Sequence, residues 1–124
     1  MWNVKEKLSQ SLILKMSDNH IILSFLKYVE QETIQRKAIL EKLLYFDTIT
    51  KQIDFMSSVF DGRTYEHGKL YEINVGLIGL REFESYDSFY ANLLSVIQYI
   101  ANKKADGLKV DINIIKKYIP DNSI

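Results

Sequence analysis

Three side chains that could coordinate a metal or transfer a proton lie close together in the middle of the sequence. Asp61, Glu66 and His67 supply two carboxylates and an imidazole, and His20 is the only other histidine. Such groups serve as zinc ligands and as general acids and bases. Their spacing matches no recognised ligand pattern, and an aspartate directly before Gly62 is typical of a turn. The sequence therefore predicts no metal site, no catalytic centre and no cofactor.

Arg63 and His67 resemble the arginine–histidine signature of helical ribonucleases of the HEPN class, whose fold is a small helix bundle of about this size. That signature separates the two residues by about four to six positions, whereas three positions separate them here. The resemblance implies an RNA-cleaving enzyme that uses this pair. Because the pair falls in a predicted loop beside a strand, we expect that the protein is not an enzyme and keep the ribonuclease as an alternative.

A second group of side chains could bind another protein. Between residues 54 and 87 the chain holds seven acidic residues and three basic ones, although its total charge is zero. Rigid aromatic side chains beside negative charge are common where a protein binds a basic partner. We predict a protein partner with a basic surface, contacted by Glu66, Glu72, Glu82, Phe83, Glu84, Tyr86 and Asp87.

The same carboxylates allow a second interpretation for residues 81–87. Acidic residues at a helix N-terminus stabilise the helix by about 0.3 to 1 kcal/mol each. This segment directly precedes a predicted helix that Asp87 or Ser85 could cap. Partner binding and helix capping therefore both remain open from the sequence.

A cluster of lysines near the C-terminus raises the question of nucleic-acid binding. Acidic residues separate these lysines, and the short helix predicted there could read few bases. We therefore do not expect nucleic-acid binding and keep a helical nucleic-acid-binding regulator as an alternative. The lysines are Lys103, Lys104, Lys109, Lys116 and Lys117.

Helical periodicity extends over most of the chain. A first helix is predicted over residues 4–16. A second runs from 20 to 46 and is interrupted or kinked near 31–33. The remaining helices are predicted from Thr48 or Thr50 to Gly62, from Asp87 or Ser85 to Gly107, and from Asp111 to the residue before Pro120, the last with a strand over 110–114 as its alternative.

One stretch changes to a two-residue period. Tyr71, Ile73, Val75 and Leu77 alternate with less apolar residues, as in a half-buried strand. We therefore predict one mainly α domain over residues 1–124, with four to five helices and one β-strand or hairpin inserted near residues 69–79. The alternative is an α+β fold with a small sheet. The predicted core residues are Leu26, Leu40, Leu43, Ile53, Val75, Leu93 and Ile97.

Composition narrows the function class further. The chain contains no cysteine, its longest apolar runs are far shorter than a membrane span, and its first residues do not form a secretion signal. We expect a cytoplasmic protein without membrane contact. In size and composition, though not by any motif, the chain is similar to bacterial immunity proteins that neutralise a cognate toxin, here predicted to be of nuclease type. A phage or plasmid inhibitor of a host defence system is the alternative.

Overall fold

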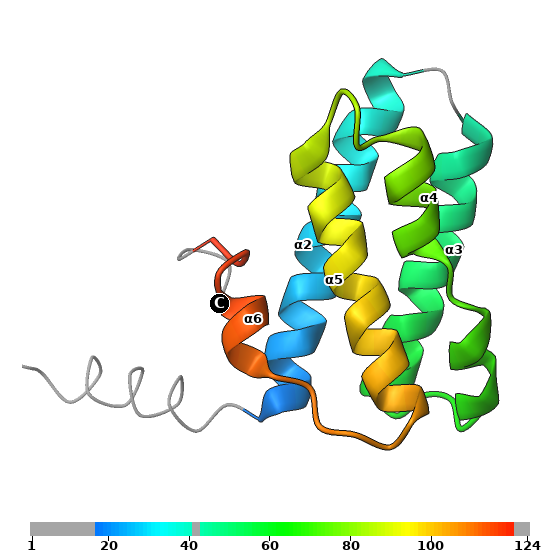
Figure 1. Cartoon of the computed structure of the whole chain (residues 1–124). Coiled ribbons are helices and arrows are strands. Elements are labelled where there is room, and N and C mark those ends of the chain that lie inside the picture. Colours follow the sequence, from blue (N-terminus) through cyan, green and yellow to red (C-terminus); the bar gives the residue numbers. More distant parts are fainter. Residues whose placement is uncertain (1–16, 41–42, 121–124) are drawn as a thin grey trace, which may run out of the picture.

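The computed structural model describes residues 17–40 and 43–120 (Figure 1). The helix predicted over residues 4–16 lies outside this range. The described helices are α2 (Asp18–Ile39), α3 (Leu43–Phe60), the 3-10 helix η1 (His67–Glu72), α4 (Val75–Glu82), α5 (Ser88–Ala105) and α6 (Ile112–Lys116).

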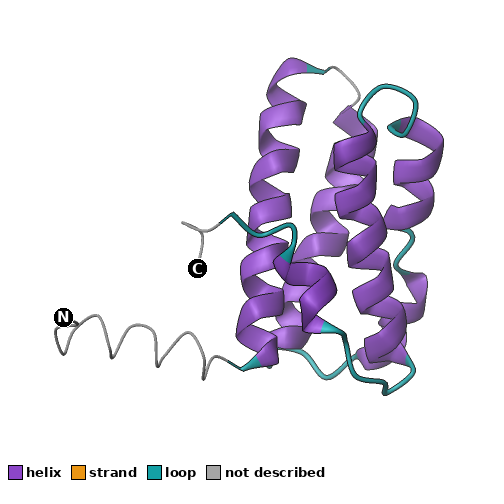
Figure 2. Cartoon of the chain, turned by 60° about the vertical axis from the view of Figure 1, so that its left-hand side comes forward, coloured by secondary structure: helices purple, strands orange, loops and turns teal. Residues whose placement is uncertain are grey.

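Helices α2 to α5 run alternately up and down and form a four-helix bundle (Figure 1). Helix α4 packs along α5, α2 packs against α3, and α6 lies against α2 (Figure 2). The mainly helical fold is therefore confirmed for the described residues. None of the helices in this part of the chain has the length and apolar content needed to cross a bilayer.

Several predicted helix boundaries are confirmed by capping contacts. The Asp87 side chain accepts a hydrogen bond from a backbone N–H of the first turn of α5, and Asp111 does the same for α6. Gly62 and Gly107 follow α3 and α5 with φ of 82° and 70°, a left-handed conformation that glycine adopts without strain. Residues 112–116 form a helix, and the alternative strand over 110–114 is not formed.

The predicted strand or hairpin near residues 69–79 is wrong. Those residues belong to η1, a short connection and α4, and the described residues contain no strand. Buried Leu70 and Ile73 stand three apart, as expected for a 3-10 turn, while Val75 and Gly79 stand four apart on the buried face of α4. The connection between the two helices produced an apparent two-residue period.

The predicted interruption near residues 31–33 is also absent, because α2 continues to Ile39 and α3 begins at Leu43. Helix α3 then runs without a stop through residue 46 to Phe60. The interruption was predicted because Ile34 is the only apolar residue between Glu30 and Lys37. Within that stretch Thr33 is buried and hydrogen-bonded on the face of α2 that meets α5. Tertiary packing thus explains a gap in the apolar stripe.

The core lies where the four helices converge. Five of the seven predicted core residues are buried, Leu40 is half-buried, and the side chain of Leu43 lies outside the described residues. The five buried residues are Leu26, Ile53, Val75, Leu93 and Ile97. An aromatic cluster of Phe46, Phe83 and Tyr90 fills one end of the bundle.

Candidate protein-binding surface

The residues predicted to contact a partner lie in two groups at opposite ends of α4 (Figure 1). Glu66 directly precedes η1 and Glu72 is its last residue, whereas the other five lie at the end of α4 and in the loop that leads to α5. An eight-residue helix is about 12 Å long. The acidic middle of the sequence is therefore not one continuous surface.

The η1 end holds ion pairs within the chain. Glu66 accepts a hydrogen bond from Lys69 Nζ at 2.9 Å, which raises the pKa of Lys69. Asp61 Oδ2 lies 2.6 Å from Arg63 Nε. Part of the acidic excess in the sequence is thus neutralised locally, and the α4–α5 end holds five of the seven predicted contact residues.

Phe83 is fully buried in this loop. Its ring packs on Phe46 at a centroid distance of 5.5 Å and edge-on against Tyr90 at 5.0 Å, and it contacts the Tyr86 ring at 5.8 Å. The structure therefore places Phe83 in the core, where it fixes the loop and has no surface to offer a partner. Sequence reasoning grouped it with surface aromatics because its immediate neighbours are charged.

Asp87 anchors the other end of the loop. Its carboxylate accepts hydrogen bonds from the Tyr90 backbone N–H at 3.2 Å and from Arg36 Nε at 2.6 Å. Burial alone would raise the pKa of Asp87, but these hydrogen bonds and the Arg36 charge hold that pKa below its ordinary value of 3.8. Helix capping is therefore an observed role of Asp87.

Arg36 connects this anchor to helix α2. Its Nη1 lies 2.6 Å from Glu32 Oε2, and its guanidinium group lies 4.5 Å from the Tyr90 ring centroid. Burial disfavours the charge, yet the hydrogen bonds to Asp87 and Glu32 raise the pKa of Arg36 above its ordinary value. Burial also raises the pKa of Tyr90 from 10.0 to about 12. Arg36, Asp87 and Tyr90 therefore each stay in one charge state around neutral pH and hold the loop against α2.

Between these two anchors Glu84, Ser85 and Tyr86 are exposed, and we refer to them as the ridge. The Tyr86 side chain is 52% exposed. Leu80, one turn before the ridge on α4, is 60% exposed. Glu82 is half-buried at the end of α4. A rigidly mounted ridge with a carboxylate, an aromatic ring and a neighbouring leucine is suited to protein contact.

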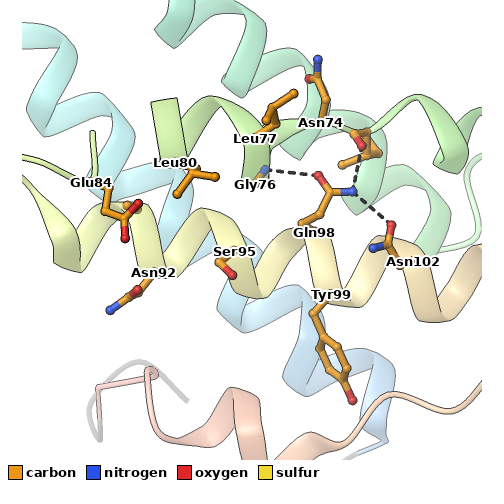
Figure 3. A pocket seen from close by; sticks show the side chains of 12 residues that line it. Asn74, Gly76, Leu77, Leu80, Glu84, Asn92, Ser95, Gln98, Tyr99 and Asn102 are labelled. Atoms are coloured by element: carbon orange, nitrogen blue, oxygen red, sulfur yellow. Dashed lines mark hydrogen bonds between the residues drawn. The ribbon is translucent and has the colours of Figure 1, made fainter. Parts of the chain in front are cut away.

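A groove of about 760 Å³ lies on one side of the ridge, between α4 and α5 (Figure 3). Leu77 and Leu80 project from α4, while Asn92 and Ser95 project from α5. Glu84 lies at the ridge end of the groove. At the other end Gln98 joins the two helices through hydrogen bonds to the Ile73 carbonyl at 2.8 Å and from the Gly76 N–H at 3.2 Å, as the dashed lines show.

The polar side chains of this groove fall into two classes. Gln98 and Asn102 are hydrogen-bonded to each other, and Asn74 is bonded to Gln52. In contrast, the side chains of Glu84, Asn92 and Ser95 make no hydrogen bond to the described residues. The first class holds the groove together, and the second is available to a ligand.

A smaller hollow of about 360 Å³ lies on the opposite side of the ridge, against α2. Tyr86 and Asp87 form its wall on the loop side, and Ile39, which is 80% exposed, lies on its α2 side. The loop therefore stands between two hollows. Sequence reasoning found the ridge but missed both hollows, although the polar residues at positions 92 and 95 were a signal that one face of α5 is not buried.

The other sequence candidates are not brought together. Among the described residues, no three histidine, aspartate or glutamate side chains are placed to hold a metal ion. Arg63 lies in a loop and pairs with Asp61, and His67 begins η1, so neither lies on a bundle helix. Of the C-terminal lysines, Lys103 lies over the Tyr99 ring and Lys104 over the Phe60 ring.

Comparison with known proteins identifies the family. The model of the Tsi6 family matches residues 22–103, from the first turns of α2 to the last turn of α5. The matched region covers more than half of the chain and includes the ridge and both of its anchors. No curated protein and no solved structure matches the chain. The chain therefore belongs to the Tsi6 family, an immunity-type family of type VI secretion whose membership implies that it binds a toxin protein.

Proposed function

We propose that this protein neutralises its cognate toxin by stoichiometric binding through the ridge, in the cytoplasm of the cell that makes it. The observation that carries the proposal is the exposure of Glu84 and Tyr86 between two fixed points, buried Phe83 and ion-paired Asp87. Tyrosine is one of the residues that most often dominate the affinity of an interface, and a carboxylate beside it complements a basic partner. Family membership favours toxin immunity over an inhibitor of host defence.

The chemistry of the ridge supports a toxin with a basic cleft, as in an enzyme that acts on a phosphate-bearing substrate. A nuclease, predicted from the sequence, is one such enzyme. The Glu84 carboxylate would occupy a position that a substrate phosphate takes, and Tyr86 would pack beside it. Opposite charges also accelerate the encounter of the two proteins, and salt weakens that effect.

The test measures binding to the cognate toxin and protection of cells against it. The variant Glu84→Lys with Tyr86→Ala should lose capture of the toxin and protection of cells, and association of the parent should slow as salt rises. Asp54→Lys is the control, because Asp54 is an exposed carboxylate on α3 away from the ridge. Its binding should equal that of the parent.

Thermal melting separates the possible failures. Exposed charge reversals change stability by about 0.5 kcal/mol, so Glu84→Lys alone should melt close to the parent, whereas the double variant also loses the ring contact between Tyr86 and Phe83. Unchanged toxin capture by a well-folded ridge variant would refute the proposed interface. Loss of capture together with a large loss of stability would assign these side chains a structural role instead.

A further inference from the structure

We propose that the groove between α4 and α5 receives one α-helix of the toxin, which presents aliphatic side chains to Leu77 and Leu80 and a lysine or arginine to Glu84. This inference rests on the proposed function, since it names the toxin element that lies beside the ridge. The groove is open at the surface, and its two walls come from different helices (Figure 3).

The two walls differ in character, which indicates how an occupant would be oriented. Leu77 and Leu80 stand three residues apart on α4, so they form one apolar stripe. Asn92 and Ser95 stand three residues apart on α5 and form a polar stripe opposite. An amphipathic helix matches both walls, because its aliphatic side chains can face the leucines while its polar side chains meet the amide and the hydroxyl.

A helix fits this groove better than an extended strand. The backbone N–H and C=O groups in the middle of α4 and α5 bond within each helix, so the groove offers no sheet edge. A strand laid against Leu77 and Leu80 would leave backbone polar groups without partners, at a cost in free energy for each. A helix satisfies its own backbone and presents only side chains.

The charge of Glu84 indicates which end of the toxin helix carries a basic residue. Of the described residues that line the groove, Glu84 alone is charged, and it lies at the ridge end. A lysine or arginine of the toxin helix would pair with it there, while the rest of the groove favours uncharged side chains. This places the basic residue of the occupant close to the part of the toxin that meets Tyr86.

The first experiment fills the groove. Asn92→Trp should slow association with the toxin or raise its dissociation constant by at least about tenfold, because the indole would occupy the space of the toxin helix. Asn113→Trp is the matched control, since Asn113 is an exposed asparagine on α6, outside the groove. It should bind as the parent does. Glu84→Gln should weaken binding about three- to tenfold and reduce its salt dependence.

A photo-crosslinking amino acid at position 92 then identifies the occupant. The expected product is a crosslink to a toxin segment that is helical and carries an aliphatic stripe with a lysine or arginine near its end. A crosslink to a strand or loop would overturn the inference, as would a folded Asn92→Trp variant that binds and protects like the parent. If the parent itself does not bind the toxin, the proposed function fails and the inference falls with it.

Discussion

Replacing Thr33 by valine should destabilise the protein because it leaves the Tyr90 hydroxyl, which lies on another helix, without a hydrogen-bond acceptor. Thr33 is 1% exposed, and its Oγ1 donates to the Val29 carbonyl at 2.8 Å. A hydroxyl has one hydrogen to donate, so the Tyr90 hydroxyl must be the donor in its 2.7 Å contact with Thr33 Oγ1. Valine keeps the shape of threonine and removes this acceptor.

The magnitude follows from which group is left without a partner. In Thr33→Val the fully buried Tyr90 hydroxyl has no acceptor, which should cost about 1 to 3 kcal/mol. In Tyr90→Phe the threonine keeps its bond to Val29, so the expected cost is about 0.5 to 1.5 kcal/mol. The double variant has no unpaired hydroxyl and should be more stable than the sum of the single effects predicts.

Chemical denaturation of the parent, both single variants and the double variant measures this coupling. Thr48→Val is the control, because Thr48 makes the same type of bond to the Leu44 carbonyl at 3.1 Å but leaves no buried group unpaired. Its effect should stay within about 0.5 kcal/mol. Purely additive effects, or a Thr33→Val variant as stable as the parent, would refute the assignment of donor and acceptor.

Three further predictions concern stability. Leu93→Ala should lower the free energy of unfolding by about 2 to 5 kcal/mol in denaturant melts, since Leu93 is fully buried; an unchanged midpoint would contradict the assignment of the α5 face. Gly76→Ala should be destabilising in the same assay, because a Cβ there would lie 2.8 Å from Gln98 Cβ, and an equal or higher midpoint would disprove the close helix contact. The pKa of Asp87 is below 3.8 in the folded state, so the stability that its carboxylate contributes is complete above about pH 4 and is lost as pH falls through the folded pKa. Asp87→Asn should therefore lose less stability in acid than the parent does. Parallel stability profiles in acid would contradict this.

The sequence predicted the elements that depend on local chemistry. Asp111 was predicted as a cap, Asp87 as one of two candidate caps beside Ser85, and Gly107 as a helix stop, because each acts on backbone groups a few residues away. The helix α5 followed from its wide apolar face. Errors arose where the burial of one residue depends on a distant helix, as at Thr33, or where two short helices adjoin, as at Ile73.

The candidate surface was predicted only in part. The charge and aromatic content of residues 82–87 pointed to the loop, but composition does not separate buried Phe83 from exposed Tyr86. Nor does it show that Arg36, far away in the sequence, pairs with Asp87. The shape of the groove depends on how closely α4 approaches α5. Gly76 and Gly79 permit that approach, but two glycines in a sequence do not predict a groove.

The aromatic contacts under the ridge bear on how long a complex would last. Phe83 packs against Phe46 and Tyr90, so the loop above it would lose little conformational freedom when a partner binds. Ordering a mobile side chain on binding costs about 0.5 to 1.5 kcal/mol, and about 1.4 kcal/mol corresponds to a tenfold change in affinity. Differences in affinity between related complexes lie mainly in the dissociation rate. For the interface proposed above, the buried Phe83 ring would therefore lengthen the time for which a toxin stays bound.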